Sequence, residues 1–297
     1  MAPDLSRDLG FSNQVTPAEP ASMIEIQGLR KLYDDYLAVD DMSFTLRQGQ
    51  ICGLVGPNGA GKTTTLRCMA GLIRATEGRL KVASCDVSAD QLELKKRLAY
   101  VPDDPPLFDD LTVGQHMDFI GRLYHVENHR NKANELLAQF DLTDKIDAGA
   151  TTLSRGMRQK LAVCCAYLFD PDVLLLDEPL TGLDPPGIRT LLGSVQDRAA
   201  RGATVIISSH LLAMIDDVVT HLLVMQTGRL QYFGAAKELR SQYPAAKTLE
   251  EAYFAATSID QGDPKNDSNT SESISNPPIV TGIENLTGGV SLNEASL

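Results

Sequence analysis

The sequence predicts an α/β fold with an antiparallel β-subdomain at its N-terminal end and an inserted helical subdomain. Short apolar runs alternate with segments of helical periodicity, a pattern typical of a sheet covered by helices. One of these runs, residues 51–55, leads through a glycine-rich turn into a helix, and residues 112–147 keep a helical pattern throughout. The alternation therefore indicates the sheet, and the long helical stretch indicates the insert.

The expected elements follow one another along the chain. Residues 24–27 and 41–46 alternate in polarity as edge strands do, whereas ICGLV at 51–55 is a short apolar run that suits a buried parallel strand. The next helix is expected over 63–73 and closes at a turn near Glu77 and Gly78. The remaining expected strands are 98–101, 173–176, 204–209 and 221–226. The remaining expected helices are 113–126, 131–142, 158–169 and 187–202, and a short helix is expected just before the strand at 221–226.

Shifts in composition divide the 297 residues into four parts. Residues 1–22 are expected to be a flexible segment, and residues 23–240 form the main domain, with the helical insert at about 105–155. A C-terminal helix is expected over 241–258. Residues 259–297 carry six acidic residues against one lysine and are rich in serine and asparagine, so this tail is expected to be disordered.

Charge and apolar content exclude several classes of protein. The net charge of −12 argues against binding to nucleic acid or anionic lipid as a main role. The longest apolar stretch, 161–169, is much shorter than the roughly 20 residues of a membrane span. The start has no apolar segment typical of a secretory signal. The five cysteines lack metal-ligand spacing, and the adjacent Cys164 and Cys165 are expected to be buried. The composition thus predicts a cytoplasmic protein.

The first chemical motif is GPNGAGKT at 56–63, which fits G-x-x-x-x-G-K-[ST] between a buried strand and a helix. Glycines let successive backbone N–H groups surround a phosphate, and the helix N-terminus adds its positive dipole end. Lys62 is predicted to reach the β- and γ-phosphates, and the Thr63 hydroxyl to bind Mg²⁺. A plain glycine turn is the alternative. The residues predicted to bind the nucleotide here are Gly56, Pro57, Asn58, Gly59, Ala60, Gly61, Lys62, Thr63 and Thr64.

A second motif, VLLLDEP, supplies two carboxylates at the end of a buried strand. Asp177 is predicted to hold magnesium through water, and Glu178 to polarise the water that attacks the γ-phosphate. Acidic residues at strand ends are also common as helix caps. The four aliphatic residues before them, together with the phosphate loop, favour the nucleotide site. These two motifs predict ATP or GTP chemistry and nothing narrower.

The segment LSRGMRQ at 153–159 narrows the prediction. It resembles the signature motif of the ATP-binding cassette (ABC) family and lies between the phosphate loop and the DEP strand, as it does in that family. The resemblance covers about residues 23–240 and implies a P-loop NTPase core of the RecA type. It places Ser154, Gly156 and Met157 at a γ-phosphate, next to a helix N-terminus. Outside this context Ser154 would be an ordinary helix N-cap.

Further landmarks of the family occur in the expected order. TGLDP at 181–185 resembles the D-loop, which contacts the opposing subunit in the family, and this implies that Asp184 belongs to the ATP site. His210 resembles the switch histidine that contacts the γ-phosphate, so it joins Glu178 as a candidate catalytic residue. Tyr33 matches the aromatic residue that stacks on adenine, with Tyr36 as the competing candidate.

Two positions depart from the family pattern. Asp103, followed by Asp104, stands where the family usually has a glutamine that bridges Mg²⁺ and the membrane partner. A carboxylate can still bind magnesium, so Asp103 is a candidate metal ligand together with Thr63 and Asp177. Arg155 replaces the first glycine of the signature, at a position that faces away from phosphate in the family, and little effect on the site is expected.

The resemblance implies a cytoplasmic ATP-binding and ATP-hydrolysing subunit of a transporter, peripheral at the inner face of the cell membrane, with ATP and Mg²⁺ as cofactors. In the family two such subunits sandwich two ATP molecules, so a homodimer or a pair with a paralogous subunit is expected. A separate transmembrane permease is expected as well, and contact with the membrane only through it. GMRQ in the signature and LEEAYFAAT near residue 250 resemble the subunits of ABC-2 type exporters.

Two other functions remain open on the sequence. One is a translation or chromosome-associated ATPase of the same superfamily. The translation factors usually carry two cassettes, and the chromosome proteins separate loop from signature by a long coiled coil, whereas Lys62 and Ser154 are 92 positions apart. The other is a binding module without hydrolysis, which the presence of Glu178 disfavours.

Overall fold

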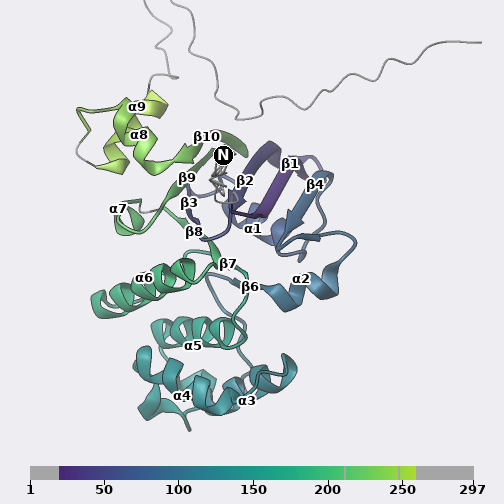
Figure 1. Ribbon diagram of the computed structural model, residues 1–297, viewed down its shortest axis with the longest axis vertical. Coiled ribbons are helices and arrows are strands. Elements are labelled where there is room, and N and C mark those ends of the chain that lie inside the picture. The colour runs from purple at the N-terminus through teal and green to yellow at the C-terminus, as the bar shows by residue number, and fades with distance from the viewer. Residues whose placement is uncertain (1–19, 211, 247, 259–297) are drawn as a thin grey trace, which may run out of the picture. The chain divides into compact units, whose positions relative to one another are not determined.

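The computed structural model describes residues 20–210, 212–246 and 248–258 (Figure 1). The strands of this part form two sheets, one of six strands in the order β10-β9-β3-β8-β7-β6 and one of four strands in the order β2-β1-β4-β5. The predicted flexible segment and acidic tail lie outside the described residues, apart from residues 20–22, and the domain boundaries remain predictions.

The six-stranded sheet is parallel except at one edge. Strands β6, β7, β8, β3 and β9 pair in parallel, and β10 pairs with β9 in the antiparallel direction. Strands β3 and β7 are buried along their whole length, which is why each is a continuous apolar run rather than an alternating one. The bounds are β3 Ile51–Val55, β6 Leu98–Val101, β7 Val173–Leu176, β8 Thr204–Ser209, β9 His221–Gln226 and β10 Arg229–Ala235.

The four-stranded sheet is antiparallel throughout. β1 (Ser22–Tyr33) pairs with β2 (Tyr36–Arg47) and with β4 (Glu77–Val82), and β4 pairs with β5 (Cys85–Asp86). These two long strands extend well beyond the predicted 24–27 and 41–46. Register shifts interrupt the alternation of polar and apolar residues along them, so the sequence pattern reveals only part of each strand. This sheet confirms the predicted N-terminal antiparallel subdomain.

The predicted turn at Glu77 and Gly78 is wrong, because these two residues begin β4. Gly78 has a φ of +102°, and a Cβ atom there would lie 2.5 Å from the carbonyl oxygen of Gly28 on β1. The glycine therefore permits a close approach of two strands, not a chain reversal. The preceding helix, α1 (Lys62–Met69), is shorter than the predicted 63–73, and Gly71 follows it in the left-handed region.

Three helices form the helical subdomain. α3 (Val113–Leu123), α4 (His129–Gln139) and α5 (Arg155–Leu168) contact one another, as Figure 1 shows. The Ser154 side chain caps α5 by accepting a hydrogen bond from the Met157 N–H, so this helix begins three residues before the predicted 158. α6 (Pro185–Ala200) packs on β3 and β8 of the six-stranded sheet, and its Ser194 hydroxyl lies 3.0 Å from the Tyr167 hydroxyl of α5.

A C-terminal helix is present but is shorter than the predicted 241–258. α8 (Ala236–Gln242) ends just before Tyr243, and α9 (Leu249–Ser258) begins after a break. Pro244 explains the break: it disfavours helical geometry at the residue before it and has no N–H to donate. The short α7 (Leu212–Ile215) was expected, whereas α2 (Gln91–Arg97) and the edge strand β10 were not.

The cysteines pack in the interior, as the sequence predicted for Cys164 and Cys165. Four of the five are buried and Cys165 is half-buried, and all five are free thiols. Burial raises the pKa of Cys68 to about 11 and that of Cys165 to about 12. These thiols therefore act as small apolar groups in the core.

Candidate active site

The phosphate loop, residues 56–61, connects the end of β3 to the start of α1. Two of its glycines lie where a side chain has no room. A Cβ atom on Gly56 would lie 2.2 Å from the Met225 carbonyl oxygen, and one on Gly61 would lie 2.5 Å from the Ala38 carbonyl oxygen. Gly61 also has a φ of +101°. The glycines thus let the loop pass directly against the backbones of β9 and β2.

Backbone hydrogen bonds hold this loop to the turn between β9 and β10. The Gly228 N–H donates to the Ala60 carbonyl at 3.1 Å, and the Asp40 N–H donates to the Gly228 carbonyl at 2.8 Å. Three segments that are distant in sequence therefore meet at Gly228. Because these bonds join main-chain atoms, they hold the loop in place without help from flexible side chains.

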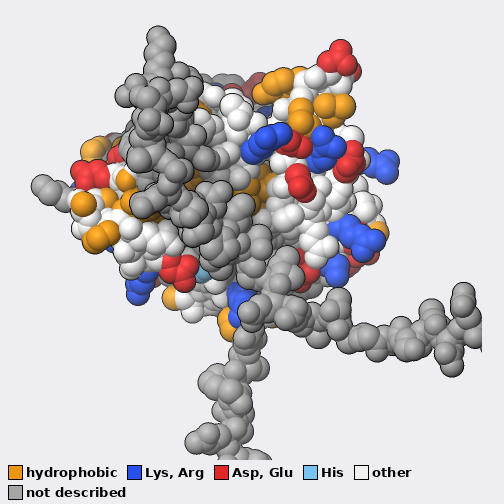
Figure 2. Space-filling view, turned by 90° about the horizontal axis from the view of Figure 1, so that it is seen from above, with side chains coloured by type: hydrophobic (Ala, Val, Ile, Leu, Met, Phe, Trp, Pro, Cys, Tyr) orange, Lys and Arg blue, Asp and Glu red, His pale blue; other side chains and the backbone are white. Residues whose placement is uncertain are grey.

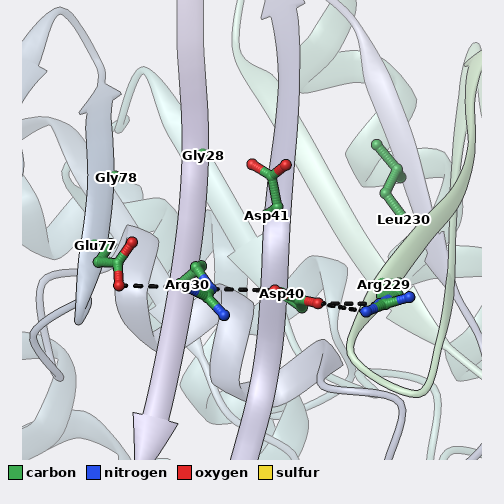
Figure 3. Close-up of a pocket in the computed structure, with 8 residues that line it drawn as sticks. All are labelled: Gly28, Arg30, Asp40, Asp41, Glu77, Gly78, Arg229 and Leu230. Atoms are coloured by element: carbon green, nitrogen blue, oxygen red, sulfur yellow. Dashed lines mark hydrogen bonds and ion pairs between the residues drawn. The ribbon is translucent and has the colours of Figure 1, made fainter.

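A row of alternating charges, which we call the charge ladder, reinforces the same junction (Figure 3). Asp40 accepts hydrogen bonds from Arg229 on one side, at 3.0 Å, and from Arg30 on the other, at 3.1 Å. Arg30 also contacts Glu77 at 3.4 Å. The ladder crosses β4, β1, β2 and β10 and borders a hollow of about 690 Å³. It therefore ties the antiparallel sheet to the edge of the parallel sheet.

Lys62 points back into the phosphate loop. Its side chain is only 6% exposed, and its Nζ donates to the Gly56 carbonyl at 2.7 Å and to the Pro57 carbonyl at 3.3 Å. A hollow of about 410 Å³, which we call the phosphate hollow, opens beside it. This hollow is lined by Tyr36, Ala38, Asn58, Gly59, Ala60, Gly61, Lys62, Thr63, Thr64, Asp103 and Glu178.

Asp177, which follows β7, is 1% exposed and fully engaged by neighbours. Its Oδ1 accepts a hydrogen bond from the Ser208 hydroxyl at 2.6 Å, and its Oδ2 accepts one from the Tyr100 hydroxyl at 3.2 Å. Burial and the nearby carboxylate raise the pKa of Tyr100 to about 12, so this hydroxyl keeps its proton at neutral pH. The carboxylate of Asp177 is therefore fixed in orientation.

Glu178 lies between the side chains of Lys62 and His210. Its Oε2 accepts a hydrogen bond from His210 Nδ1 at 2.8 Å, and its Oε1 lies 3.6 Å from Lys62 Nζ. Its N–H donates to the Ser208 hydroxyl at 2.9 Å. Its φ of +48° lies in the left-handed region. The structure thus brings the predicted catalytic pair, Glu178 and His210, together beside the phosphate loop.

The signature segment and the D-loop pack on each other in the same chain. A Cβ atom on Gly156 would lie 2.4 Å from the Gly182 carbonyl oxygen, so only glycine fits there. The Asp184 side chain caps α6 by accepting a hydrogen bond from the Gly187 N–H at 3.2 Å. Among the described residues that line the phosphate hollow, Ser154, Gly156, Met157 and Asp184 do not occur.

The two candidate aromatic residues lie opposite each other at the end of the β1–β2 hairpin, where Tyr33 pairs with Tyr36. Tyr36 is among the described residues that line the phosphate hollow, and Tyr33 is not. The ring of Tyr33 instead lies under Lys31, whose Nζ is 4.6 Å from its centroid. Tyr36 therefore forms part of the wall of the phosphate hollow, while the adenine contact of Tyr33 remains a prediction.

Comparison with known proteins decides the family. The model of the ABC transporter family matches residues 39–181. The ABC-type transporter ATP-binding protein EcsA of Bacillus subtilis is 30% identical over 244 residues, which are 81% of this chain and 99% of that protein. The chain belongs to the ABC transporter family.

Other relatives agree with this membership. The daunorubicin resistance ATP-binding protein DrrA3 of Streptomyces coeruleorubidus is 34% identical, covering 74% of this chain and 70% of that one. The Nod factor export ATP-binding protein I of Ralstonia nicotianae is 35% identical, covering 73% and 68%. A solved ATP-binding subunit of an ABC transporter is 28% identical and superposes with a TM-score of 0.75 over 79% of this chain and 99% of that one.

The protein is thus an ATP-binding subunit of an ABC transporter and an ATPase, as the motifs predicted, and the P-loop NTPase core is confirmed. None of the helices within the described residues has the length and apolarity needed to span a membrane. The non-transport alternatives are set aside by the relatives, which are transporter subunits.

Sequence reasoning missed two parts of this ABC site. One is Ser208, whose hydroxyl contacts both the Asp177 carboxylate and the Glu178 N–H. Its polar side chain at the end of an apolar strand, two residues before His210, was the available signal. The other is the ion pair between Asp103 and Arg155, whose atoms Oδ1 and Nη2 are 2.7 Å apart. Neither residue's neighbours in sequence indicate this contact.

Proposed function

We propose that this ATPase subunit works as half of a dimer, which holds two ATP molecules between facing subunits and drives export through a separate membrane permease. One observation carries the dimer. The phosphate hollow of a chain lacks the signature and D-loop residues of that same chain among its described lining. A second subunit, identical or paralogous, would bring its own Ser154, Gly156 and Met157, or their equivalents, to this hollow.

The contacts around Glu178 support a role as the group that polarises the attacking water. Its carboxylate lies beside the phosphate hollow and is held by Lys62 on one side and His210 on the other. His210 Nδ1 donates to the carboxylate, so the carboxylate is oriented rather than free to rotate. When ATP enters, Lys62 exchanges the carbonyl oxygens of Gly56 and Pro57 for phosphate oxygens, which are stronger acceptors.

Magnesium fits the oxygen atoms at this end of the sheet. The Thr63 hydroxyl and the Asp103 carboxylate are hard oxygen ligands of the kind that Mg²⁺ prefers, and Asp177 would hold the ion through water. Among the described residues, no group of three or more His, Cys, Asp or Glu side chains is close enough to hold a metal alone. The chain would therefore share the ion with phosphate oxygens and water. When bound, Mg²⁺ neutralises charge on the phosphates.

Two kinds of support point to export at a membrane. Two of the relatives above are named for daunorubicin resistance and for Nod factor export. The helical subdomain exposes large apolar side chains, among them Phe108, Phe119 and Leu123, and such groups favour a docking surface for the permease. Phe108 and Phe119 lie edge to face, 5.3 Å apart, and form one patch. The subunit would then be cytoplasmic and peripheral, touching the membrane only through the permease.

Nucleic acid is not proposed as a partner. The net charge of the chain is −12. On the visible part of the face in Figure 2, basic and acidic side chains lie side by side rather than in a basic patch. A surface of this kind offers no continuous field for a phosphate backbone.

The variant Glu178→Gln tests the proposal. Without the carboxylate, turnover should fall by about 10²–10⁴-fold while ATP still binds. Light scattering after gel filtration with ATP should show a dimer of Glu178→Gln, and the double variant Lys62→Ala/Glu178→Gln should remain monomeric as the matched control. A monomer of Glu178→Gln at saturating ATP would contradict the dimer, and turnover at the wild-type rate would contradict the role of Glu178.

A further inference from the structure

Two ion pairs connect the loop after β6 to the first turn of α5. Arg155 Nη2 lies 2.7 Å from Asp103 Oδ1, and Arg158 Nη2 lies 3.2 Å from Asp104 Oδ1. The two carboxylates are adjacent in sequence and the two guanidinium groups are one helical turn apart, so the pairs are parallel. All four side chains are at least one-third exposed.

The two pairs differ in whether their carboxylate lines the phosphate hollow. Asp103 is among the residues that line the phosphate hollow, whereas the described lining does not include Asp104, which is 76% exposed. The side chain of Arg155 also contacts a second segment. Its Cγ and Cδ lie 3.3 Å from the position that a Cβ atom on Gly182 would take, so its stem packs on the D-loop. The guanidinium reaches Asp103 from a supported position.

The charge of the phosphate hollow makes this difference important. Its described lining contains two carboxylates, Asp103 and Glu178, and a single cation, Lys62. An arriving triphosphate brings several further negative charges. Because like charges at short range raise the free energy of the bound state, an uncompensated Asp103 opposes ATP binding. Arg155 is the cation that contacts Asp103 directly.

We propose that Arg155, although part of the signature segment, is a positioning residue of the ATP site in its own chain. It neutralises Asp103 and holds that carboxylate toward the signature helix, so that the phosphate hollow accepts the triphosphate. This inference rests on the assignment of the phosphate hollow to ATP. The signature residues would then act on two nucleotides, the partner's through Ser154 and Gly156, and the chain's own through Arg155.

A double-mutant cycle measured by ATP-analogue binding tests the proposal. Calorimetry with a non-hydrolysable ATP analogue in the presence of a chelator, at low salt, reports Kd without turnover and without magnesium. Arg155→Gln should raise Kd about two- to fivefold, the range expected for one exposed ion pair. Asp103→Asn in the same chain should return Kd to the wild-type value or below. Both effects should shrink at high salt, since surface charges are screened there.

Arg158→Gln is the matched control, because it breaks the parallel pair whose carboxylate lies outside the described lining of the hollow. It should leave Kd unchanged. Arg155→Lys, which keeps the charge, should rescue most of the affinity, and melting temperatures should show that each variant is folded. An equal Kd for wild type and Arg155→Gln, or equal losses in Arg155→Gln and Arg158→Gln, would overturn the inference. Failure of the wild-type chain to bind the analogue even with magnesium present would instead contradict the ATP assignment itself.

Discussion

The phosphate loop and the signature segment are fixed by different kinds of contact. Around the loop, glycines lie against the backbones of β9 and β2, and Gly228 bonds to Ala60 and Asp40 through main-chain atoms. The signature segment is joined to the loop after β6 by two exposed ion pairs. The comparison teaches that main-chain contacts fix the phosphate loop, whereas the signature segment combines the packing of Gly156 on Gly182 with exposed ion pairs that cost little to exchange.

The largest effect should come from the substitution Gly61→Ala. The new methyl group would lie 2.5 Å from the Ala38 carbonyl oxygen, at a φ of +101° that alanine rarely adopts. Neither the methyl group nor the neighbouring backbone can move away without a large cost in free energy. Unfolding free energy should fall by at least about 2 kcal/mol, and ATP-analogue affinity should be lost. Calorimetric melting and binding measure both.

Gly193→Ala is the control for this prediction. Gly193 lies within α6, and a Cβ atom there would meet no heavy atom within 4 Å. Alanine should therefore stabilise the protein by about 0.5–1 kcal/mol, because glycine weakens a helix interior. If Gly61→Ala melted and bound as wild type does, the loop would be more plastic than its contacts indicate.

A smaller effect is expected for Ser208→Ala, which tests whether the carboxylate end of the site is as rigid as the loop. The substitution removes a 2.6 Å hydrogen bond to the buried Asp177 and the acceptor of the Glu178 N–H. Stability should fall by about 1–3 kcal/mol, because buried polar atoms lose their partner. Turnover should fall more than ATP affinity does, since the loop itself is intact. Equal losses in both would show that Ser208 supports the loop as well.

Next in size is the charge ladder. Asp40→Asn would leave Arg30 and Arg229 without their shared anion and should cost about 1 kcal/mol of stability, with slight weakening of ATP binding through Gly228. Glu77→Gln, at the more exposed end, should change melting temperature little. Denaturant unfolding of the two variants at low and high salt separates them. A larger cost for Glu77→Gln would show that the ladder is not centred on Asp40.

The smallest effect on stability should come from the double variant Arg155→Gln/Arg158→Gln. Both ion pairs are exposed, so their joint loss should cost less than about 1 kcal/mol. Hydrogen exchange of amides in residues 153–158 should nevertheless become faster than in the phosphate loop, where backbone bonds remain. Unchanged exchange in the signature segment would mean that packing of Gly156 on Gly182 alone holds it.

Contiguous motifs were the part of this site that sequence could predict. In the phosphate loop and the DEP segment, the functional residues follow one another directly in sequence. Their order along the chain therefore already indicated which of them lie side by side. Ser208 and the pair of Arg155 and Asp103 depend on contacts between residues 31 and 52 positions apart, which no local pattern encodes. The same holds for β4 and β10, whose exposed or irregular patterns conceal strands that the sheet completes.

The backbone of Glu178 is strained at the residue that we propose polarises the attacking water. Its φ of +48° belongs to a region that glycine and asparagine tolerate well and that glutamate adopts at a cost of roughly 1–2 kcal/mol. Glu178→Asn and Glu178→Gln remove the same charge, yet asparagine suits this conformation better, so the asparagine variant should melt higher. A change made for stability alone at this position would thus remove the carboxylate that we propose polarises the attacking water.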